Sequence, residues 1–148
     1  MRPDWLAPLR TYLLTIAGGH LVWEVAQLPL YTIWRSGTLG EKVFAVMHCT
    51  AGDMLVALSA IAAALVFIGH RDWPMRRFWA ISAITVTLGV SYTVFSEWLN
   101  VSIRGSWAYS ELMPTLSLPG FRLGVSPLLQ WIIVPSLAFW RLWRMQNR

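Results

Sequence analysis

Several ionisable residues lie in long apolar stretches of this sequence, where a charge is costly. Three of the seven acidic residues, Glu24, Asp53 and Glu97, occupy such stretches, and so do two of the three histidines, His20 and His48. On insertion scales an Asp at the centre of a membrane helix costs about 2.5–3.5 kcal/mol, so such groups normally face a protein interior and mark function. Carboxyl and imidazole groups donate and accept protons, which favours acid–base chemistry or the binding of a cation.

The spacing of the polar residues in the first apolar stretch places them on one helical face. His20, Glu24, Gln27 and Tyr31 follow one another at intervals of four, three and four residues, which is the period of an α-helix. Asp53 shares a face of the second stretch with several alanines, which permit close contact between helices. We therefore predict that Glu24, Asp53 and His20 form the catalytic group of a functional site.

Candidate ligand-binding residues come from all four apolar stretches. Counted from the predicted outer ends of the helices, Glu24, Asp53 and Tyr92 lie about eight to ten residues inside, or about 12–15 Å. Trp131 lies slightly nearer the outer end, so we expect these four side chains to line one cavity in the outer half of a bundle. The other residues predicted to bind a ligand are Gln27, Trp23, Gln130 and Glu97.

The elements that must position these residues are membrane helices. The 148 residues are 56% hydrophobic and 13% charged, and their mean hydropathy is +0.51, whereas a soluble domain carries about 25% charged residues. Four stretches, at about 11–34, 43–69, 78–100 and 124–143, approach or exceed the roughly 20 apolar residues that a membrane helix needs. Pro29 is expected to kink the first helix, and the loop before the last is expected to be irregular. The sequence thus predicts an all-α fold, in which residues 1–148 form one integral membrane, four-helix antiparallel bundle.

The basic residues predict how this bundle is oriented. They lie in short groups between the apolar stretches, so the net charge of +5 does not indicate nucleic-acid binding. Eight of the twelve Lys and Arg residues lie at the termini and in the second loop, and four lie in the first and third loops. By the positive-inside rule, both termini are expected in the cytoplasm, and the Arg-rich composition favours a bacterial inner membrane. The expected partner is a membrane lipid or hydrophobic small molecule, and a homodimer stays open.

Structural roles for the same residues also stay open. His20 and Glu24 are suited to a hydrogen-bond staple between helices, and Asp53 to a structural partner of a neighbouring helix. Glu97 lies near a predicted helix end, a position typical of a solvated interfacial group. Eight tryptophans lie near helix ends as an interfacial belt, whereas Trp131 is deeper and suits core packing.

Metal or haem binding is a further alternative. The candidate ligands are His20, Glu24, His48, Asp53 and Glu97. However, no helix carries two of the usual ligands at the spacing of a paired metal site, and at 100° per residue His48 points about 140° away from Asp53. We therefore predict no metal site and no cofactor.

Four short motifs follow one another along the apolar stretches. Residues 19–24 contain a His-x-x-x-acid motif, residues 52–57 carry the carboxylate of Asp53, residues 89–92 form Gly-x-x-Tyr, and residues 131–135 form Trp-x-x-x-Pro. In this order they resemble the emopamil-binding protein family, the EXPERA domain of sterol isomerases and the sigma-2 receptor. The sequence departs from the family where Leu128 replaces an amide one turn before the Trp, with Gln130 on another face. The sterol isomerases also carry an additional N-terminal helix.

The resemblance implies an acid–base isomerisation of an alkene in a sterol-like or isoprenoid lipid. One group would protonate a carbon of the double bond, a second would remove an allylic proton, and an aromatic face would stabilise the carbocation. On this hypothesis Glu24 and Asp53 are the acid and the base, His20 sets the protonation state of Glu24, and Trp131 or Trp23 lies over the cation. The alternative is a non-catalytic binder of a hydrophobic or amphipathic ligand, as in the sigma-2 branch, in which one carboxylate pairs with a cation or hydroxyl.

Overall fold

The computed structural model describes residues 5–147, and most of them are helical. The helices are α1 (Leu6–Gln27), the 3-10 turn η1 (Leu28–Leu30), α2 (Ile33–Ser36), α3 (Leu39–Ile68), α4 (Phe78–Glu97), the π-helical η2 (Trp98–Ile103) and α5 (Val125–Gln146). Two strands, β1 (Thr115–Leu118) and β2 (Phe121–Gly124), form one antiparallel hairpin. The prediction of a mostly all-α chain is therefore confirmed.

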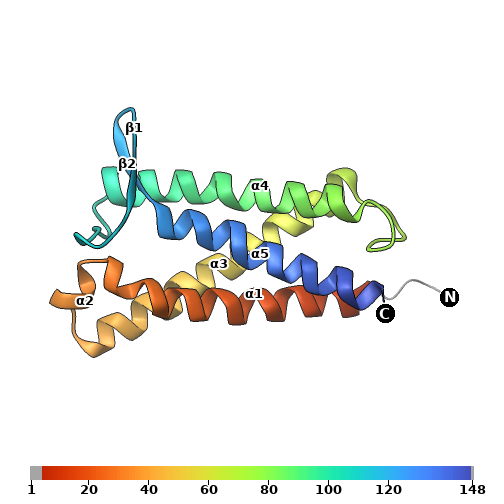
Figure 1. The fold of residues 1–148 in the computed structure, drawn as a ribbon, viewed down its shortest axis with the longest axis horizontal. Coiled ribbons are helices and arrows are strands. Elements are labelled where there is room, and N and C mark those ends of the chain that lie inside the picture. The colour runs from red at the N-terminus through yellow and green to blue at the C-terminus, as the bar shows by residue number, and fades with distance from the viewer. Residues whose placement is uncertain (1–4, 148) are drawn as a thin grey trace.

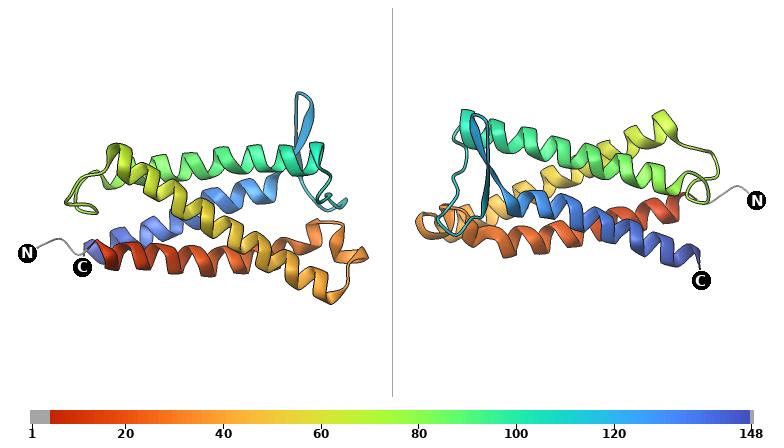
Figure 2. Two further views of the ribbon diagram at one scale, coloured as in Figure 1. Left: turned by 180° about the vertical axis from the view of Figure 1, so that it is seen from behind. Right: turned by 45° about the horizontal axis from the view of Figure 1, so that its top comes forward.

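Four long helices lie side by side and alternate in direction along the chain (Figure 1). Helix α1 contacts α3 and α5, and α4 contacts the same two helices. The two ends of the chain lie at the same end of this arrangement, and the hairpin lies at the opposite end (Figure 2). We call the end that carries the hairpin the outer end.

Three of these helices are long and apolar enough to cross a membrane: Leu39–Ile68, Phe78–Ile103 and Val125–Gln146. Their outward-facing residues are large and apolar, as are those of α1; the side chains of Phe67 in α3 and Leu14 in α1 are 83% and 67% exposed. Helix α1 is not among the three, because its inward face carries the polar residues. The outer surface of the fold thus suits contact with lipid tails.

The elements at the outer end differ from those expected. The first long helix ends at Gln27 and not near residue 34, because Pro29 lies in the first turn of η1 and the chain turns there. The loop predicted to be irregular contains the β-hairpin, whose turn places Gly120 at a φ of 88°. Helix α3 begins at Leu39, four residues earlier than expected, where Thr38 and Glu41 form a capping box.

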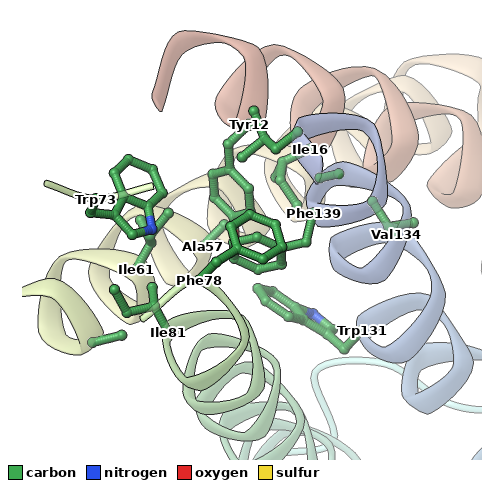
Figure 3. Close-up of a cluster of buried hydrophobic side chains, with 13 residues drawn as sticks. Tyr12, Ile16, Ala57, Ile61, Trp73, Phe78, Ile81, Trp131, Val134 and Phe139 are labelled. Atoms are coloured by element: carbon green, nitrogen blue, oxygen red, sulfur yellow. The ribbon is translucent and has the colours of Figure 1, made fainter. Parts of the chain in front are cut away.

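An apolar core fills the half of the bundle nearer the termini. Figure 3 shows Tyr12 and Ile16 of α1 meeting Phe139 of α5, with Phe78 of α4 against the same ring. The ring centroids of Tyr12 and Phe139 are 4.9 Å apart. This core holds the four helices at one end, and the polar residues of the same helices meet in the other half.

A segment between η2 and the hairpin ties the outer ends of α1 and α4 together. The Thr32 N–H donates to the Ala108 carbonyl at 3.0 Å, and the Ser110 N–H donates to the Leu30 carbonyl at 2.8 Å. Tyr31 and Tyr109 form an isolated β-bridge between these two strands of chain. We call residues 107–110 the strap.

Candidate functional site

The Gln130 amide lies at the centre of a buried polar network between α1, α3 and α5. Its Nε2 atom lies 2.9 Å from Glu24 Oε1, 3.0 Å from Asp53 Oδ2 and 2.8 Å from His20 Nδ1. Both carboxyl groups accept from this one nitrogen, so two acids from different helices lie within two hydrogen-bond lengths of each other. The Glu24 and Asp53 carboxyl groups also contact each other directly.

Asp53 has two further partners. Its Oδ2 atom lies 2.9 Å from His20 Nδ1, and its Oδ1 accepts the Trp131 indole N–H at 3.1 Å. His20 is fully buried, whereas the Asp53 side chain is 17% exposed. Asp53 is therefore the member of the acid–imidazole group that a molecule outside the bundle can reach.

A chain of hydrogen bonds joins this group to the start of α5. The Trp23 indole N–H donates to Ser126 Oγ at 3.1 Å, and the Ser126 hydroxyl donates to Gln27 Oε1 at 2.8 Å. Gln27 Nε2 then donates to Glu24 Oε1 at 2.9 Å and to Gln130 Oε1 at 3.1 Å. We call Trp23, Ser126, Gln27 and Gln130 the relay.

Two glycines allow the helices to approach closely enough for these bonds. A Cβ atom at Gly19 would lie 2.6 Å from a methyl group of Val134, so glycine is needed where α1 meets α5. A Cβ atom at Gly89 would lie 2.1 Å from the Trp131 ring, so α4 packs directly on that indole. The Trp131 ring also lies against His20, with centroids 4.9 Å apart. Trp131 is thus packed on α4 and on the imidazole, and its N–H orients Asp53.

The structure brings most of the predicted site residues together. His20, Glu24, Gln27, Asp53, Gln130 and Trp131 share the network, and Trp23 joins it through Ser126. The expectation that His20 acts on Glu24 changes, because the partner of its Nδ1 atom is Asp53. Gln130, which lies on another face than Leu128 at the family's amide position, is 2% exposed and central, and Asp53 is bonded to both Gln130 and Trp131.

Tyr92 does not join this network. Its side chain is half exposed and packs beside Phe95, with ring centroids 6.4 Å apart. The buried face of α4 continues from Gly89 through Thr93 to Glu97, one residue away from the face on which Tyr92 lies. Tyr92 therefore does not meet Glu24, Asp53 and Trp131 as expected, and those three residues meet in a hydrogen-bonded network.

Glu97 lies in a second polar cluster at the outer end. It is 5% exposed, and its Oε2 atom accepts a hydrogen bond from the Tyr109 hydroxyl of the strap. The same hydroxyl accepts the Gly124 N–H at 2.9 Å. Burial and the nearby Glu97 charge raise the pKa of Tyr109. Glu97 is thus buried at the outer end of the bundle, where it is bonded to the strap. The interfacial, solvated position considered for it is wrong.

Sequence reasoning missed two residues, Ser126 and Tyr109. Both residues form hydrogen bonds to residues distant in the sequence, and a lone Ser at the start of a helix or a lone Tyr in a loop gives no signal of such a contact. His48 is exposed and stacks on Phe44, with centroids 5.4 Å apart. Within residues 5–147, no group of three or more His, Cys, Asp or Glu side chains is arranged to hold a metal ion.

A groove runs along the outside of the bundle between α1 and α3, and neither Glu24 nor Asp53 lines it. Its volume is about 610 Å³, and its lining includes Leu13 and Ala17 of α1 and Met54 of α3, the residue after Asp53. Arg10 lines the end of the groove that is nearer the chain termini. The groove is apolar enough for a lipid chain.

The network is suited to moving protons rather than to holding a fixed ion pair. Of the side chains that the structure describes, those in the network include no lysine or arginine, so the two carboxyl groups have only neutral donors and one imidazole beside them. Two carboxyl groups in contact exchange one proton between them, because both cannot be ionised without a large cost. Comparisons of this chain with protein-family models, curated proteins and solved structures find no match.

Proposed function

We propose that this chain is an integral membrane protein in which α1, α3, α4 and α5 all cross the bilayer as an antiparallel bundle. Three of the helices are apolar enough to span a membrane. Helix α1 lies against α3 and α5 and turns its polar residues toward them. The Lys and Arg distribution supports cytoplasmic termini and a bacterial inner membrane, although Arg2 and Arg148, two of the residues counted, lie outside the described part of the chain.

The function that we propose is isomerisation of a carbon–carbon double bond in a sterol-like or isoprenoid lipid, as in the EXPERA family. The observation that carries the proposal is that Glu24 and Asp53, on different helices, share the Gln130 nitrogen and contact each other. Two adjacent carboxyl groups in an apolar interior can act as a proton donor and a proton acceptor in one reaction. His20, bonded to Asp53, orients that carboxyl group.

The proposed step conserves atoms and electrons. One carboxyl group gives its proton to one carbon of the double bond, which leaves a carbocation at the other carbon. The other carboxylate removes a proton from the carbon next to the cation, and that C–H electron pair forms the new double bond. The pair has then lost one proton and gained one, so a transfer between the two carboxyl groups restores the starting state. Trp131 supports this step by holding Asp53, since its ring is packed on Gly89 and His20.

The α1–α3 groove supports the same proposal from the side of the substrate. It is apolar, and its α3 member, Met54, follows the partly exposed Asp53 in the sequence. On this proposal a lipid lies along the groove and reaches Asp53 from the α1–α3 side. Asp53 is then the acid that gives its proton to the substrate, and Glu24 is the carboxylate that removes one.

Deuterium incorporation tests the proposal with a lipid mixture in place of one chosen substrate. The purified protein is incubated in D₂O with vesicles of total bacterial lipid, and lipid masses are followed. We expect the wild type to introduce deuterium into one lipid class and Glu24→Gln to lose at least about a hundredfold in rate, the range of general acid–base catalysis. His48→Ala, at an exposed site away from the network, is the matched control. If the folded wild type incorporates no deuterium, the isomerase proposal fails.

A second candidate is a non-catalytic binder of an amphipathic amine. It is favoured by the absence of a cationic side chain in the described network and by the exposed edge of Asp53. Two essential acids favour turnover, whereas one favours binding. If the protein binds a radiolabelled lipophilic amine, the folded Glu24→Gln variant retains that binding, and no deuterium is incorporated, the binder is the correct function.

A further inference from the structure

We propose that Trp23 and Ser126 are positioning residues that hold the Gln27 and Gln130 amides as donors toward the carboxyl pair and so favour the ionised form of Glu24. The inference rests on the proposed function in one respect: it concerns the proton balance of the site to which that function is assigned. Neither Trp23 nor Ser126 touches a carboxyl group. We infer their role from the direction of each hydrogen bond in the relay.

The direction is set at the outer end of the relay by Trp23. An indole N–H can only donate, so Ser126 Oγ must accept at this bond, which is 3.1 Å long. The single hydroxyl proton of Ser126 is then free to point onward. It donates to Gln27 Oε1 at 2.8 Å, in a contact that is nearly fully shielded from solvent.

Each glutamine amide then has only one favourable orientation. The Gln27 carbonyl is held by Ser126, so its NH₂ group must face Glu24 Oε1 and Gln130 Oε1, at 2.9 and 3.1 Å. The Gln130 carbonyl is held in turn by Gln27, so its NH₂ group faces Glu24 and Asp53. Glu24 Oε1 therefore accepts two N–H groups, which stabilises a carboxylate at that position.

The inner end of the relay is the Gln130 NH₂ group. Gln130 Nε2 has two hydrogens but lies within 3.0 Å of three atoms: Glu24 Oε1, Asp53 Oδ2 and His20 Nδ1. One of these three contacts must therefore be completed by a proton on His20 or on Asp53.

Removal of the Ser126 hydroxyl would leave the orientation of the Gln27 amide unfixed. The Gln27 amide could then turn, and its carbonyl oxygen would face Glu24 Oε1. Two acceptors in contact require a hydrogen between them, so Glu24 would take up a proton. The relay thus lowers the fraction of Glu24 that is protonated before a substrate arrives.

Infrared spectroscopy of the carboxyl C=O stretch tests the inference on the full-length protein in detergent micelles, with no substrate present. The Glu24 band is identified as the signal that is lost in Glu24→Gln. In Ser126→Ala and in Trp23→Phe we expect the ratio of protonated to ionised Glu24 to rise by about fivefold at constant pH, which corresponds to one hydrogen bond of about 1 kcal/mol. Ser126→Thr, which keeps the hydroxyl, should restore the wild-type ratio.

The matched controls change the same residue types outside the relay. Ser82→Ala removes a buried hydroxyl that donates to the Phe78 carbonyl of its own helix at 2.9 Å, and Trp140→Phe removes an exposed indole of α5. Both should leave the Glu24 band unchanged. If Ser126→Ala and Trp23→Phe fold but leave the ratio unchanged, the inference is wrong; if neither variant folds, the relay is structural and the inference is equally wrong. A shifted band in a protein that incorporates no deuterium would uphold the relay while the isomerase proposal fails.

Discussion

His20 of α1 and Asp53 of α3 are joined by a contact of 2.9 Å between Nδ1 and Oδ2. The imidazole is fully buried, and the carboxyl group is not, so a proton that arrives at Asp53 from outside the bundle meets a base that is shielded from water. The second oxygen of Asp53 accepts the Trp131 N–H. Both oxygens of this carboxyl group are therefore engaged, whereas only Oε1 of Glu24 accepts from the amides.

This difference predicts unequal effects of two isosteric substitutions. In Glu24→Gln the carbonyl can keep the place of Oε1, and the new NH₂ group can donate to Asp53. In Asp53→Asn one NH₂ hydrogen must face a donor, either the Trp131 N–H or the Gln130 amide N–H. We expect Asp53→Asn to be less stable than Glu24→Gln by about 1–3 kcal/mol, the cost of unpaired buried polar groups. Thermal melts in the same detergent measure the difference, and equal melting temperatures would contradict the hydrogen-bond assignment.

The contact between α4 and α5 predicts a steric effect at Gly89. A methyl group at Gly89 would overlap the Trp131 ring at 2.1 Å, so we expect Gly89→Ala to destabilise the fold by about 1–3 kcal/mol or more. Gly52→Ala is the matched control, because a Cβ atom at Gly52 meets nothing within 4 Å. It should be neutral or stabilising by up to about 1 kcal/mol, since alanine favours helix. The chain has 10 tryptophans, which obscure the fluorescence of Trp131, so unfolding by circular dichroism is the measurement.

Tyr109 predicts a loss of stability at alkaline pH. Its pKa is raised above the ordinary tyrosine value of 10.0, first by burial and then by the Glu97 charge. The folded protein thus keeps the phenol proton at a pH where the unfolded chain loses it. Its contribution to the free energy of unfolding is complete below pH 10 and declines as the pH rises above that value.

The Tyr109→Phe variant separates this contribution from those of other groups. It leaves the Glu97 carboxyl group and the Gly124 N–H without their shared partner, so we expect a loss of about 1–3 kcal/mol near neutral pH. Above about pH 10, the ordinary tyrosine pKa, its melting temperature should fall less steeply than that of the wild type. A parallel decline in both proteins would show that Tyr109 does not contribute.

The proposed orientation is tested by reporters inserted into the two ends of the bundle. A reporter in the turn at Gly120, between β1 and β2, should be extracytoplasmic, and one after residue 148 should be cytoplasmic. The turn is exposed and connects two short strands, so an insertion there is expected to be tolerated. Cytoplasmic activity of the reporter at Gly120 would reverse the orientation.

The long apolar runs are enough to predict α3, α4 and α5, because a mostly apolar run of about 20 residues has few alternatives to a helix in a membrane. The polar face of α1 also follows from its spacing, and that face does carry His20, Glu24 and Gln27 into the network. The helical spacing alone does not show which side chain of a neighbouring helix each polar residue contacts. The pairing of His20 with Asp53 depends on how far α1 and α3 slide past each other, which local sequence does not determine.

The prediction that Tyr92 faces the site is wrong for a different reason. The polar stripe of α4 runs through Ser82, Thr85 and Gly89, and the spacing extends it to Tyr92, although the buried face turns to Thr93. Tyr92 and Thr93 are neighbours in the sequence and both lie close to the stripe. The packing of α4 against the other helices decides which of them is buried. A tyrosine can place its ring in an apolar layer and its hydroxyl at a polar boundary, so the presence of a hydroxyl is a weak guide to the interior.

The position of Gln130 has a consequence for biosynthesis. Helix α1 leaves the ribosome first, and its polar face is completed by a residue that lies 110 positions after His20 and 106 after Glu24. Until α5 has been made, the nascent chain carries an acid and an imidazole for which that amide does not yet exist. We therefore expect α1 to remain in the insertion machinery, or at the membrane surface, until the last helix arrives. Chains truncated before α5 should be recognised by quality-control proteases, even though they contain two of the three most apolar helices.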